Sequence, residues 1–376
     1  KPRRMSIDEK TVRKVAKLAR LAPRVPTRAP APKNALSSLI PARQTDDGPL
    51  HLVEHTYGPA PELDADSLRA LALHTTPLDT ARPLYFDTET TGLMGGTGTL
   101  AFLLGVADVR DGQTVVTQLH LPAPGHERPM LQWLAERVEQ ATVLISFNGK
   151  SFDWPLLKAR FVMNRLPPPP ERPHVDLLHC ARRVFRHHLD ELKLSTLERR
   201  VLDFHRRGDI DGAQIPAAWF DYLRTGRVAT LARVLSHNER DVKSMVDLVQ
   251  RLLAAWEERH PVLPETALGL ATVASRFGDE ARALRFVERA TEKGLAEAWE
   301  LKAELQRRRG DYAASVETLQ RALEHHERKA VIHLRLAKLY EHRLRDYERA
   351  RQHAESCGPA ETAEAHAARQ RRLATR

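Results

Sequence analysis

The sequence predicts an α/β domain, a mixed sheet with flanking helices, followed by an all-α domain of helical repeats. Between about residues 84 and 146, apolar runs of strand length alternate with a hairpin turn and an amphipathic segment of helical period. From about residue 262 the pattern changes, and a helix-opening Asp recurs at a period near 32 to 35 residues. A chain of 376 residues has room for about two or three such domains.

The first part of the chain is basic and rich in Pro and Ala, most clearly over residues 20–33. Such a segment buries too little apolar surface to order itself, so we expect residues 1–48 to be flexible, with a short helix over Ile7–Leu21. The sheet domain is then expected over residues 49–258, and the repeats with a basic tail over residues 262–376.

The sheet domain begins with a short apolar strand and continues with a hairpin, a helix and a further strand. The Gly-rich stretch Gly92–Gly98 follows the first strand, but it lacks the Gly-Lys-Ser/Thr ending of a phosphate loop and is expected to be a flexible loop beside the site. The elements are strands Leu84–Asp87, Thr99–Asp108 and Thr114–Leu121, a turn at Arg110–Gly112, helix Met130–Gln140 and strand Val143–Ser146.

Two carboxylates, Asp87 and Glu89, lie two residues apart where the first strand ends. Residues i and i+2 of a strand project from the same face, so the two acids point together. Burying unpaired carboxylates is costly, whereas Mg²⁺ and Mn²⁺ prefer oxygen ligands. The pair therefore predicts a divalent metal site, with a solvated strand end as the alternative.

A second acidic segment follows the strand Val143–Ser146, where a polar turn carries Asn148 and Asp153. A helix is expected from Trp154, with Pro155 in its first turn. Asp153 is then either a further metal ligand or a cap of that helix.

The third acidic segment, Leu235–Met245, has the pattern of a continuous helix. His237 and Asp241 are four residues apart and share one face, while an apolar stripe can dock the helix on a sheet. A hydrogen-bonded surface pair is the alternative for these two side chains.

Together the three segments supply enough carboxylates for two shared metal ions about 3.5–4 Å apart. A histidine with an unperturbed pKa near 6.5 can accept a proton from water at neutral pH. This is a set of groups for phosphodiester hydrolysis. Its members are Asp87, Glu89, Asp153, His237 and Asp241.

These segments resemble the three motifs of the DEDD exonuclease superfamily, which has a ribonuclease-H-like fold. Further motifs resemble its YprB-like branch. The resemblance implies a two-metal-ion 3′→5′ exonuclease that acts on DNA or RNA, with the four acids as ligands of two Mg²⁺ or Mn²⁺ ions. The matching residues are Asp87-Thr-Glu-Thr-Thr-Gly92, Asn148 to Asp153 and His237-Asn-Glu-Arg-Asp241, and for the branch Leu194–Glu198, Ile215-Pro216 and Tyr222–Gly226.

The sequence departs from the family at the proton acceptor. His-type members carry histidine five residues before the last aspartate, where this chain has Ser236. His237 lies four residues before it, where Tyr-type members have tyrosine. The resemblance therefore assigns the metal ligands more firmly than it assigns His237 as the base.

Substrate contacts are expected from polar and basic residues near these motifs. The basic run that includes His187, His188 and Lys193 suits phosphates, although such runs are more often solvated faces. Asp176 is expected to form core hydrogen bonds or to support the metal ligands, and Ser195–Glu198 resembles a capping box. The candidate substrate contacts are Thr88, Asn148, Arg182, Arg183 and Arg186.

A net charge of +10 and a pI near 9.8 favour a polyanionic partner. Only two cysteines occur, which argues against a disulfide framework or a thiolate zinc site and fits a reducing cytoplasm. No apolar run approaches 18 residues, so no membrane span is expected. We therefore expect a cytoplasmic protein.

The repeats resemble tetratricopeptide repeats, and three such units are near the minimum for an independent stack. Partner binding, nucleic-acid contact and a scaffold role remain open for them. The alternative to an exonuclease is a catalytically weak nucleic-acid-binding adaptor that recruits a protein through its repeats. DNA versus RNA, strandedness, polarity, exo versus endo mode and oligomeric state are not decided by the sequence.

Overall fold

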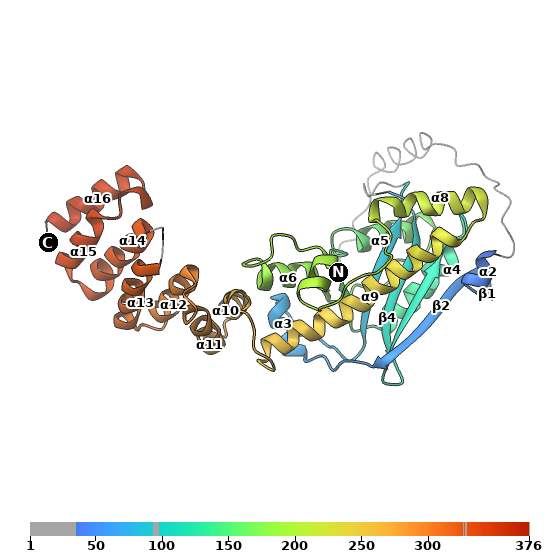
Figure 1. Cartoon of the computed structure of the whole chain (residues 1–376), viewed down its shortest axis with the longest axis horizontal. Helices are drawn as coiled ribbons and strands as arrows, with labels where there is room; N and C mark the ends of the chain where they lie inside the picture. The colour runs from blue at the N-terminus through green and yellow to red at the C-terminus, as the bar shows by residue number, and fades with distance from the viewer. Residues whose placement is uncertain (1–34, 93–97, 326, 328, 376) are drawn as a thin grey trace, which may run out of the picture. The chain divides into compact units, whose positions relative to one another are not determined.

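The computed structural model describes residues 35–92, 98–325, 327 and 329–375. The expected helix over Ile7–Leu21 and most of the Gly-rich stretch Gly92–Gly98 lie outside these residues. The chain divides into two compact units (Figure 1). The first contains the described part of the chain up to Ala65, then Pro77–Leu177 and Lys193–Arg251; the second contains Asp66–Thr76, Leu178–Leu192 and the chain from Leu252.

A mixed sheet of seven strands forms the first unit, in the order β1-β2-β5-β4-β3-β6-β7. β3 pairs antiparallel with β4 and parallel with β6, so it lies where the two kinds of pairing meet. This confirms the α/β fold class that the sequence predicts. The strands are β1 (Ala42–Thr45), β2 (Gly48–Pro59), β3 (Pro83–Thr90), β4 (Ala101–Arg110), β5 (Gln113–His120), β6 (Val143–Ser146) and β7 (His174–Asp176).

Helices cover both faces of this sheet (Figure 1). On one face, Phe86 and Leu104 pack against α4 and α5. On the other, Phe102 stacks on Trp219 of α8 with ring centroids 5.2 Å apart, and α9 covers the neighbouring strands. The helices of this unit are α2 (Ala35–Leu39), α4 (Arg128–Gln140), α5 (Asp153–Met163), α7 (Leu194–Arg200), the 3₁₀ turn η1 (Gly212–Gln214), α8 (Ile215–Thr225) and α9 (Ala229–Trp256).

The predicted turn between β4 and β5 is present. Asp111 and Gly112 both have positive φ, 49° and 72°. Consecutive left-handed residues make a tight hairpin whose twist matches that of the strands.

Regular structure begins earlier than the expected boundary at residue 49. Leu36 and Ile40 are buried in the same apolar cluster as Trp219. β1 pairs with the start of β2. Residues 35–48 therefore take part in the sheet unit, because their apolar side chains are close enough to its core to be buried there.

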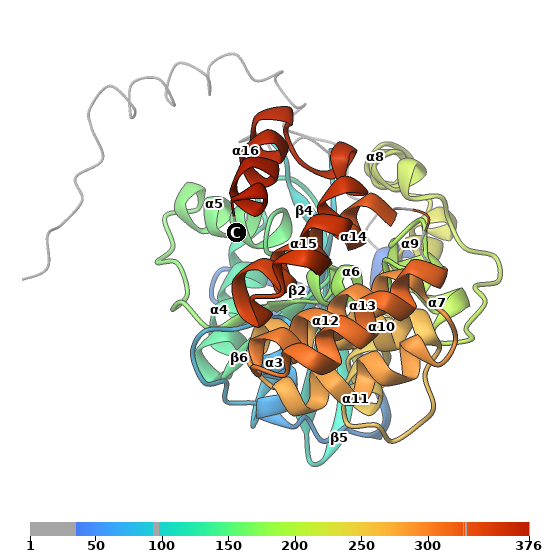
Figure 2. The ribbon, with the colours of Figure 1, turned by 90° about the vertical axis from the view of Figure 1, so that its left-hand side faces the viewer.

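The second unit is helical, and its successive helices pack in pairs (Figure 2). This confirms a helical C-terminal region, while its assignment to tetratricopeptide repeats stays a prediction. The helices are α3 (Ala65–Ala72), α6 (Leu177–Phe185), α10 (Pro264–Phe277), α11 (Glu280–Thr291), α12 (Ala296–Arg308), α13 (Tyr312–His325), α14 (Lys329–Leu339), the π turn η2 (Tyr340–Leu344), α15 (Tyr347–Glu355), the 3₁₀ turn η3 (Gly358–Ala360) and α16 (Ala363–Ala374).

The recurring Asp opens a helix in each repeat, as the sequence predicts. Asp279, Asp311 and Asp346 each accept a hydrogen bond from the backbone N–H three residues later, at 2.9, 3.1 and 3.0 Å. These bonds satisfy amide groups that the first helical turn leaves unpaired.

Among the described residues, no helix combines the length and the apolar composition that a membrane span requires.

Candidate active site

The acids of the three predicted segments meet beside the C-terminal half of β3, which lies between β4 and β6 in the sheet. Asp87 and Glu89 are both inside β3 and project from one face, which α9 covers. Glu89, His237 and Asp241 each offer one ligand atom within 4.8 Å of the other two. Asp153, the first residue of α5, lies close enough to repel Asp87 electrostatically. The structure thus brings together all five residues predicted for catalysis.

A row of cross-strand neighbours positions Asp87. Asp87 pairs with Gly105 on β4, and Gly105 pairs with Gln118 on β5. Asn238 of α9 lies over this row. It donates from Nδ2 to Asp87 Oδ2 at 2.9 Å and accepts at Oδ1 from Gln118 Nε2 at 3.0 Å. The Asn238 amide is completely buried, so these bonds fix both α9 and the carboxylate.

Gly105 makes this close approach possible. A Cβ at this position would lie 2.3 Å from Asn238 Oδ1 and 2.7 Å from Val242 Cγ2. Both distances are shorter than van der Waals contact. Only glycine at this point of β4 lets α9 lie close enough for Asn238 to reach Asp87.

Asp153 is held by contacts on both sides of the turn that precedes it. Thr88 donates from Oγ1 to Asp153 Oδ1. Asp176 of β7 accepts from the backbone N–H of Asn148 at 2.8 Å and of Lys150 at 3.2 Å, which shapes the turn. Asp176 therefore forms the hydrogen bonds expected of it. The N-cap residue of α5 is Phe152 and Asp153 is the first residue of the helix, so Asp153 does not occupy the N-cap position.

Burial and mutual repulsion raise the pKa values of these acids. Burial is the larger cause for Asp87, followed by repulsion from Asp241, Asp153 and Glu89, and the pKa rises well above the usual range. The same causes raise the pKa of Glu89 to about 8. Clustered carboxylate oxygens that repel one another are the donor set that a divalent cation stabilises.

His237 has a partner at each ring nitrogen. Nδ1 lies 2.9 Å from Asp209 Oδ1, and Nε2 lies 3.4 Å from Asp241 Oδ2. Arg206 Nη1 also lies 3.3 Å from Nδ1, so the ring is held between Asp209 and Arg206 on one side and Asp241 on the other. Although burial opposes it, hydrogen bonds from Arg206 and His237 keep the pKa of Asp209 below its usual value.

Arg206, which sequence reasoning missed, connects the loop after α7 to the site. Its guanidinium donates to Glu198 at 2.5 and 2.6 Å, to Asp209 at 2.9 Å and to Asp241. Glu198 is completely buried and also accepts from Ser244 of α9 at 2.6 Å. One cation thus balances a buried structural acid and a candidate metal ligand.

The capping-box interpretation of Ser195–Glu198 is wrong. The N-cap of α7 is Lys193, and no side chain caps this helix end. The carboxylate of Glu198 is instead neutralised by Arg206, because a buried acid requires a charged or hydrogen-bonded partner. The spacing of Ser and Glu resembled a cap, but the burial that decides the matter is a tertiary property.

The predicted substrate contacts lie in different places. Thr88 is buried and bound to Asp153, so its hydroxyl positions an acid. Asn148 adopts a left-handed backbone, φ 66°, in the turn before Asp153. The three arginines belong to the second unit, where they line a cavity of about 330 Å³ with Arg276; they are Arg182, Arg183 and Arg186.

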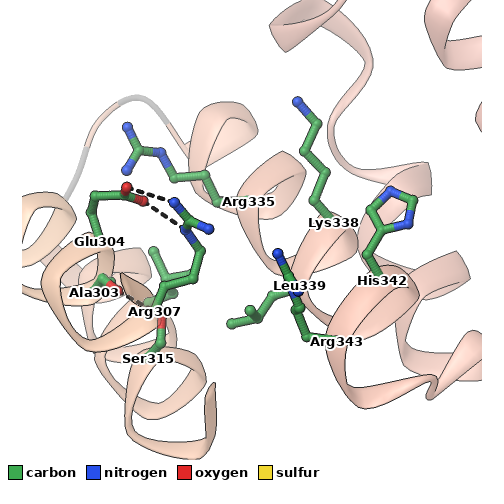
Figure 3. A pocket seen from close by; sticks show the side chains of 10 residues that line it. Ala303, Glu304, Arg307, Ser315, Arg335, Lys338, Leu339, His342 and Arg343 are labelled. Carbon is green, nitrogen blue, oxygen red and sulfur yellow. Dashed lines mark hydrogen bonds and ion pairs between the residues drawn. The ribbon is translucent and has the colours of Figure 1, made fainter. Parts of the chain in front are cut away.

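A larger basic cavity, about 480 Å³, lies in the second unit between α12 and α13 on one side and α14 and η2 on the other (Figure 3). Arg307 forms an ion pair with Glu304 at 2.7 Å inside it. Arg343 lies over the Tyr312 ring. Among the described residues, Lys338 has no carboxylate within ion-pair distance, so the cavity keeps an excess of positive charge.

The mixed sheet with its flanking helices is a ribonuclease-H-like fold, and residues 84–253 match a family model described as the RNase_H superfamily. The chain is 35% identical to the uncharacterized protein YprB of Bacillus subtilis (strain 168) over 283 residues, which are 72% of this chain and 68% of that protein. It belongs to the YprB family. The match to the ribonuclease H superfamily supports a nuclease-type function.

Among solved structures, the chain is similar to the family B DNA polymerase of the hyperthermophilic archaeon Pyrobaculum calidifontis. The TM-score is 0.38 and the sequence identity 18%. The match covers 74% of this chain and 38% of the polymerase chain.

Proposed function

We propose that this protein is a metal-dependent 3′→5′ exonuclease that hydrolyses phosphodiester bonds of DNA or RNA. The observation that carries the proposal is the convergence of four carboxylates from β3, α5 and α9 beside a histidine. The match to the ribonuclease H superfamily supports the reaction class. The polarity and the two-ion mechanism follow from the motif resemblance and form part of the proposal.

The donor set fits Mg²⁺ or Mn²⁺. Hard cations of this kind take carboxylate oxygens, and the pKa values of Asp87 and Glu89 stay raised although Arg206 binds Asp241, so further positive charge would stabilise the cluster. When bound, two such ions activate a water, stabilise the leaving oxygen and clamp the phosphate. The residues that would hold them are Asp87, Glu89, Asp153 and Asp241.

His237 is assigned to accept the proton of the attacking water at Nε2. Asp209 orients the ring through Nδ1 and stabilises the imidazolium that forms. Asn238 holds Asp87, and Thr88 holds Asp153, so the acids do not have to be ordered when substrate binds.

One observation favours the alternative, a weakly catalytic adaptor. Arg206 already neutralises Asp241, and a guanidinium at a metal ligand competes with a cation for the same oxygen. An adaptor would keep that ion pair permanently. An active nuclease would retain metal binding at Asp241 despite it, through the second oxygen or after Arg206 turns to Glu198 and Asp209.

The test uses purified protein, Mg²⁺ or Mn²⁺, and single- and double-stranded DNA and RNA labelled at either end. The proposal expects a metal-dependent ladder that shortens from the 3′ end on at least one substrate. Products that shorten from the 5′ end would correct the polarity, and internal cuts would correct the exonuclease mode. Binding of a substrate without any cleavage, at saturating metal, would favour the adaptor.

A further inference from the structure

Three side chains with metal-binding atoms meet near the C-terminal end of the second unit. Cys357 follows α15 and is completely buried, Glu361 follows η3, and His366 is on α16. Their ligand atoms all lie within 4.8 Å of one another. Cys357 Sγ is 3.6 Å from Glu361 Oε1 and 3.8 Å from His366 Nδ1, and this nitrogen is 3.4 Å from the same Oε1.

These three distances match the edges of a tetrahedron around zinc. With zinc bonds of about 2.3 Å to sulfur, about 2.05 Å to nitrogen and about 2.1 Å to oxygen, tetrahedral angles place sulfur about 3.6 Å from both other atoms. The same bonds place nitrogen about 3.4 Å from oxygen. The largest difference from the observed separations is about 0.2 Å, so the three atoms form one face of a zinc tetrahedron.

Hydrogen bonding alone explains the cluster less well. The thiol already has an acceptor, the carbonyl oxygen of Ala354 at 3.2 Å. The separation of 3.4 Å between His366 Nδ1 and Glu361 Oε1 is longer than the usual range of about 2.7–3.2 Å for N–H···O bonds. The two separations at sulfur suit either a thiol hydrogen bond or shared zinc, whereas the long separation between nitrogen and oxygen suits a ligand set better than a hydrogen bond.

A buried guanidinium orients the carboxylate of this cluster. Arg369 donates to Glu361 Oε1 at 3.3 Å and to Oε2 at 3.2 Å. It also binds the buried Glu341, at 2.5 Å, and this second acid balances its charge. A hydrogen-bonded partner behind a carboxylate ligand is the usual arrangement around protein metal sites.

We propose that Cys357, Glu361 and His366 form a zinc site that joins the end of α15 to α16. Zinc binding displaces the thiol proton, and the fourth position is left for water or an exchangeable ligand. Thiolate and imidazole select zinc over the harder Mg²⁺ and Mn²⁺ expected at the all-oxygen acid cluster. The cysteine count argued against a thiolate zinc site, but a site with one thiolate needs no second cysteine.

The test is cobalt substitution of the full-length protein after removal of metal with a chelator. One equivalent of Co²⁺ should give a thiolate-to-cobalt charge-transfer absorption, which the all-oxygen acid cluster cannot produce. Zn²⁺ should abolish this absorption by displacement. His366→Gln should weaken zinc affinity about 100-fold or more, since a lost ligand costs at least as much as a lost supporting residue. Cys357→Ser should remove the absorption altogether.

Cys180→Ser is the matched control, because Cys180 is the other buried cysteine and the absorption should survive its loss. Asp241→Asn should also leave the absorption unchanged, which separates this site from the acid cluster. His366 is half-buried, so the Gln variant tests the site if the buried Cys357→Ser variant fails to fold. The proposal is overturned if wild-type protein gives no charge-transfer absorption, or if His366→Gln binds zinc as tightly as wild type.

Discussion

At the scale of single residues, the site is dominated by acids whose pKa values are raised by burial and mutual repulsion. Asp87 and Glu89 carry this penalty most clearly. Hydrogen-bonding partners offset this electrostatic penalty only in part: Asn238 donates to Asp87, and Arg206 donates to Asp241. The protein without metal therefore stores unfavourable electrostatic energy here, which a bound divalent cation would relieve.

The stored repulsion predicts an unusual pH dependence. The folded pKa of Glu89 is about 8, above its usual 4.5, so the folded state holds a proton that the unfolded state has released between these pH values. Stability of the metal-free protein should then fall as pH rises from about 4.5 to 8. Glu89→Gln should unfold at a higher temperature than wild type at pH 8, with a smaller difference at pH 5. Thermal unfolding in chelator measures this, and an equal difference at both pH values would contradict the assigned cause.

His237→Ala should lower the rate of hydrolysis about 10²–10⁴-fold, the usual contribution of a positioned general base. Asp209→Asn should have a smaller effect, about 10–100-fold, because Asp209 acts through the His237 ring, which it orients and whose charged form it stabilises. Rates at saturating Mn²⁺ between pH 6 and 9 check both variants. An unchanged pH profile in His237→Ala would reduce this residue to a structural role.

The site residues that the sequence predicted are marked by short spacings along the chain, whereas the residues that it missed act through contacts between distant segments. The two-residue spacing of Asp87 and Glu89 fixes their common direction on any strand. Arg206 has no such signal, because its partners Glu198 and Asp241 are 8 and 35 residues away and the loop path decides the contact. Asn238 appeared only as part of a family motif. Its bonds to Asp87 and Gln118 depend on the strand register that aligns these two residues.

At the scale of elements, α9 and β3 form the frame of the site. α9 runs 28 residues and carries His237, Asn238 and Asp241, so its position over the sheet places three site residues at once. The sequence predicted this helix from its apolar stripe, and it predicted β6 with the bounds that the structure has. The packing of α9 on Gly105 could not be predicted from the sequence. It depends on which face of β4 the helix covers and on the register in which β4 pairs with β3.

Gly105→Ala should therefore damage the site without removing any ligand. The added methyl group must displace α9, at a cost of about 1–3 kcal/mol or more, as for other overpacked positions. Both the unfolding temperature and the Mn²⁺ affinity measured by calorimetry should fall. Gly58→Ala on β2 is the control, since nothing lies within 4 Å of its added Cβ. Equal behaviour of the two variants would show that α9 tolerates displacement.

The second unit shows why the domain boundaries were harder to predict than the elements. α10 packs on α6, where a Cβ on Gly269 would lie 2.2 Å from the carbonyl oxygen of Val184. α6 is part of a segment that the sequence assigns to the sheet domain. Contacts between segments some 85 residues apart leave no periodic pattern, so composition and turn signals cannot reveal them.

At the scale of the whole molecule, a net charge of +10 predicts attraction to a polyanion. The basic cavity of Figure 3 is the place in the second unit where this prediction can be tested. Ion pairs already occupy Arg307 and Arg335, with Glu304 and Glu300. Lys338 and Arg343 are the cations to alter.

If the second unit contacts nucleic acid, the double variant Lys338→Glu, Arg343→Glu should weaken binding to long oligonucleotides. The slope of log affinity against log salt concentration should also become shallower, by the release of about two counterions. The variant Arg224→Glu, Arg227→Glu changes the net charge equally on the exposed surface of the first unit and serves as the control. Equal salt slopes in the two variants would leave protein binding or scaffolding as the role of the cavity.

Hydrolysis of an end-labelled oligonucleotide by wild type and by Asp241→Asn, at saturating Mn²⁺, tests the central claim most directly. Asp241 is a proposed metal ligand, contacts His237 and forms an ion pair with Arg206. Asparagine has nearly the same size as aspartate but carries no charge. The account predicts metal-dependent shortening by wild type and loss of at least about 10²-fold of the rate in the folded variant. An Asp241→Asn protein that degrades the oligonucleotide as fast as wild type would contradict the assignment of this cluster as the active site.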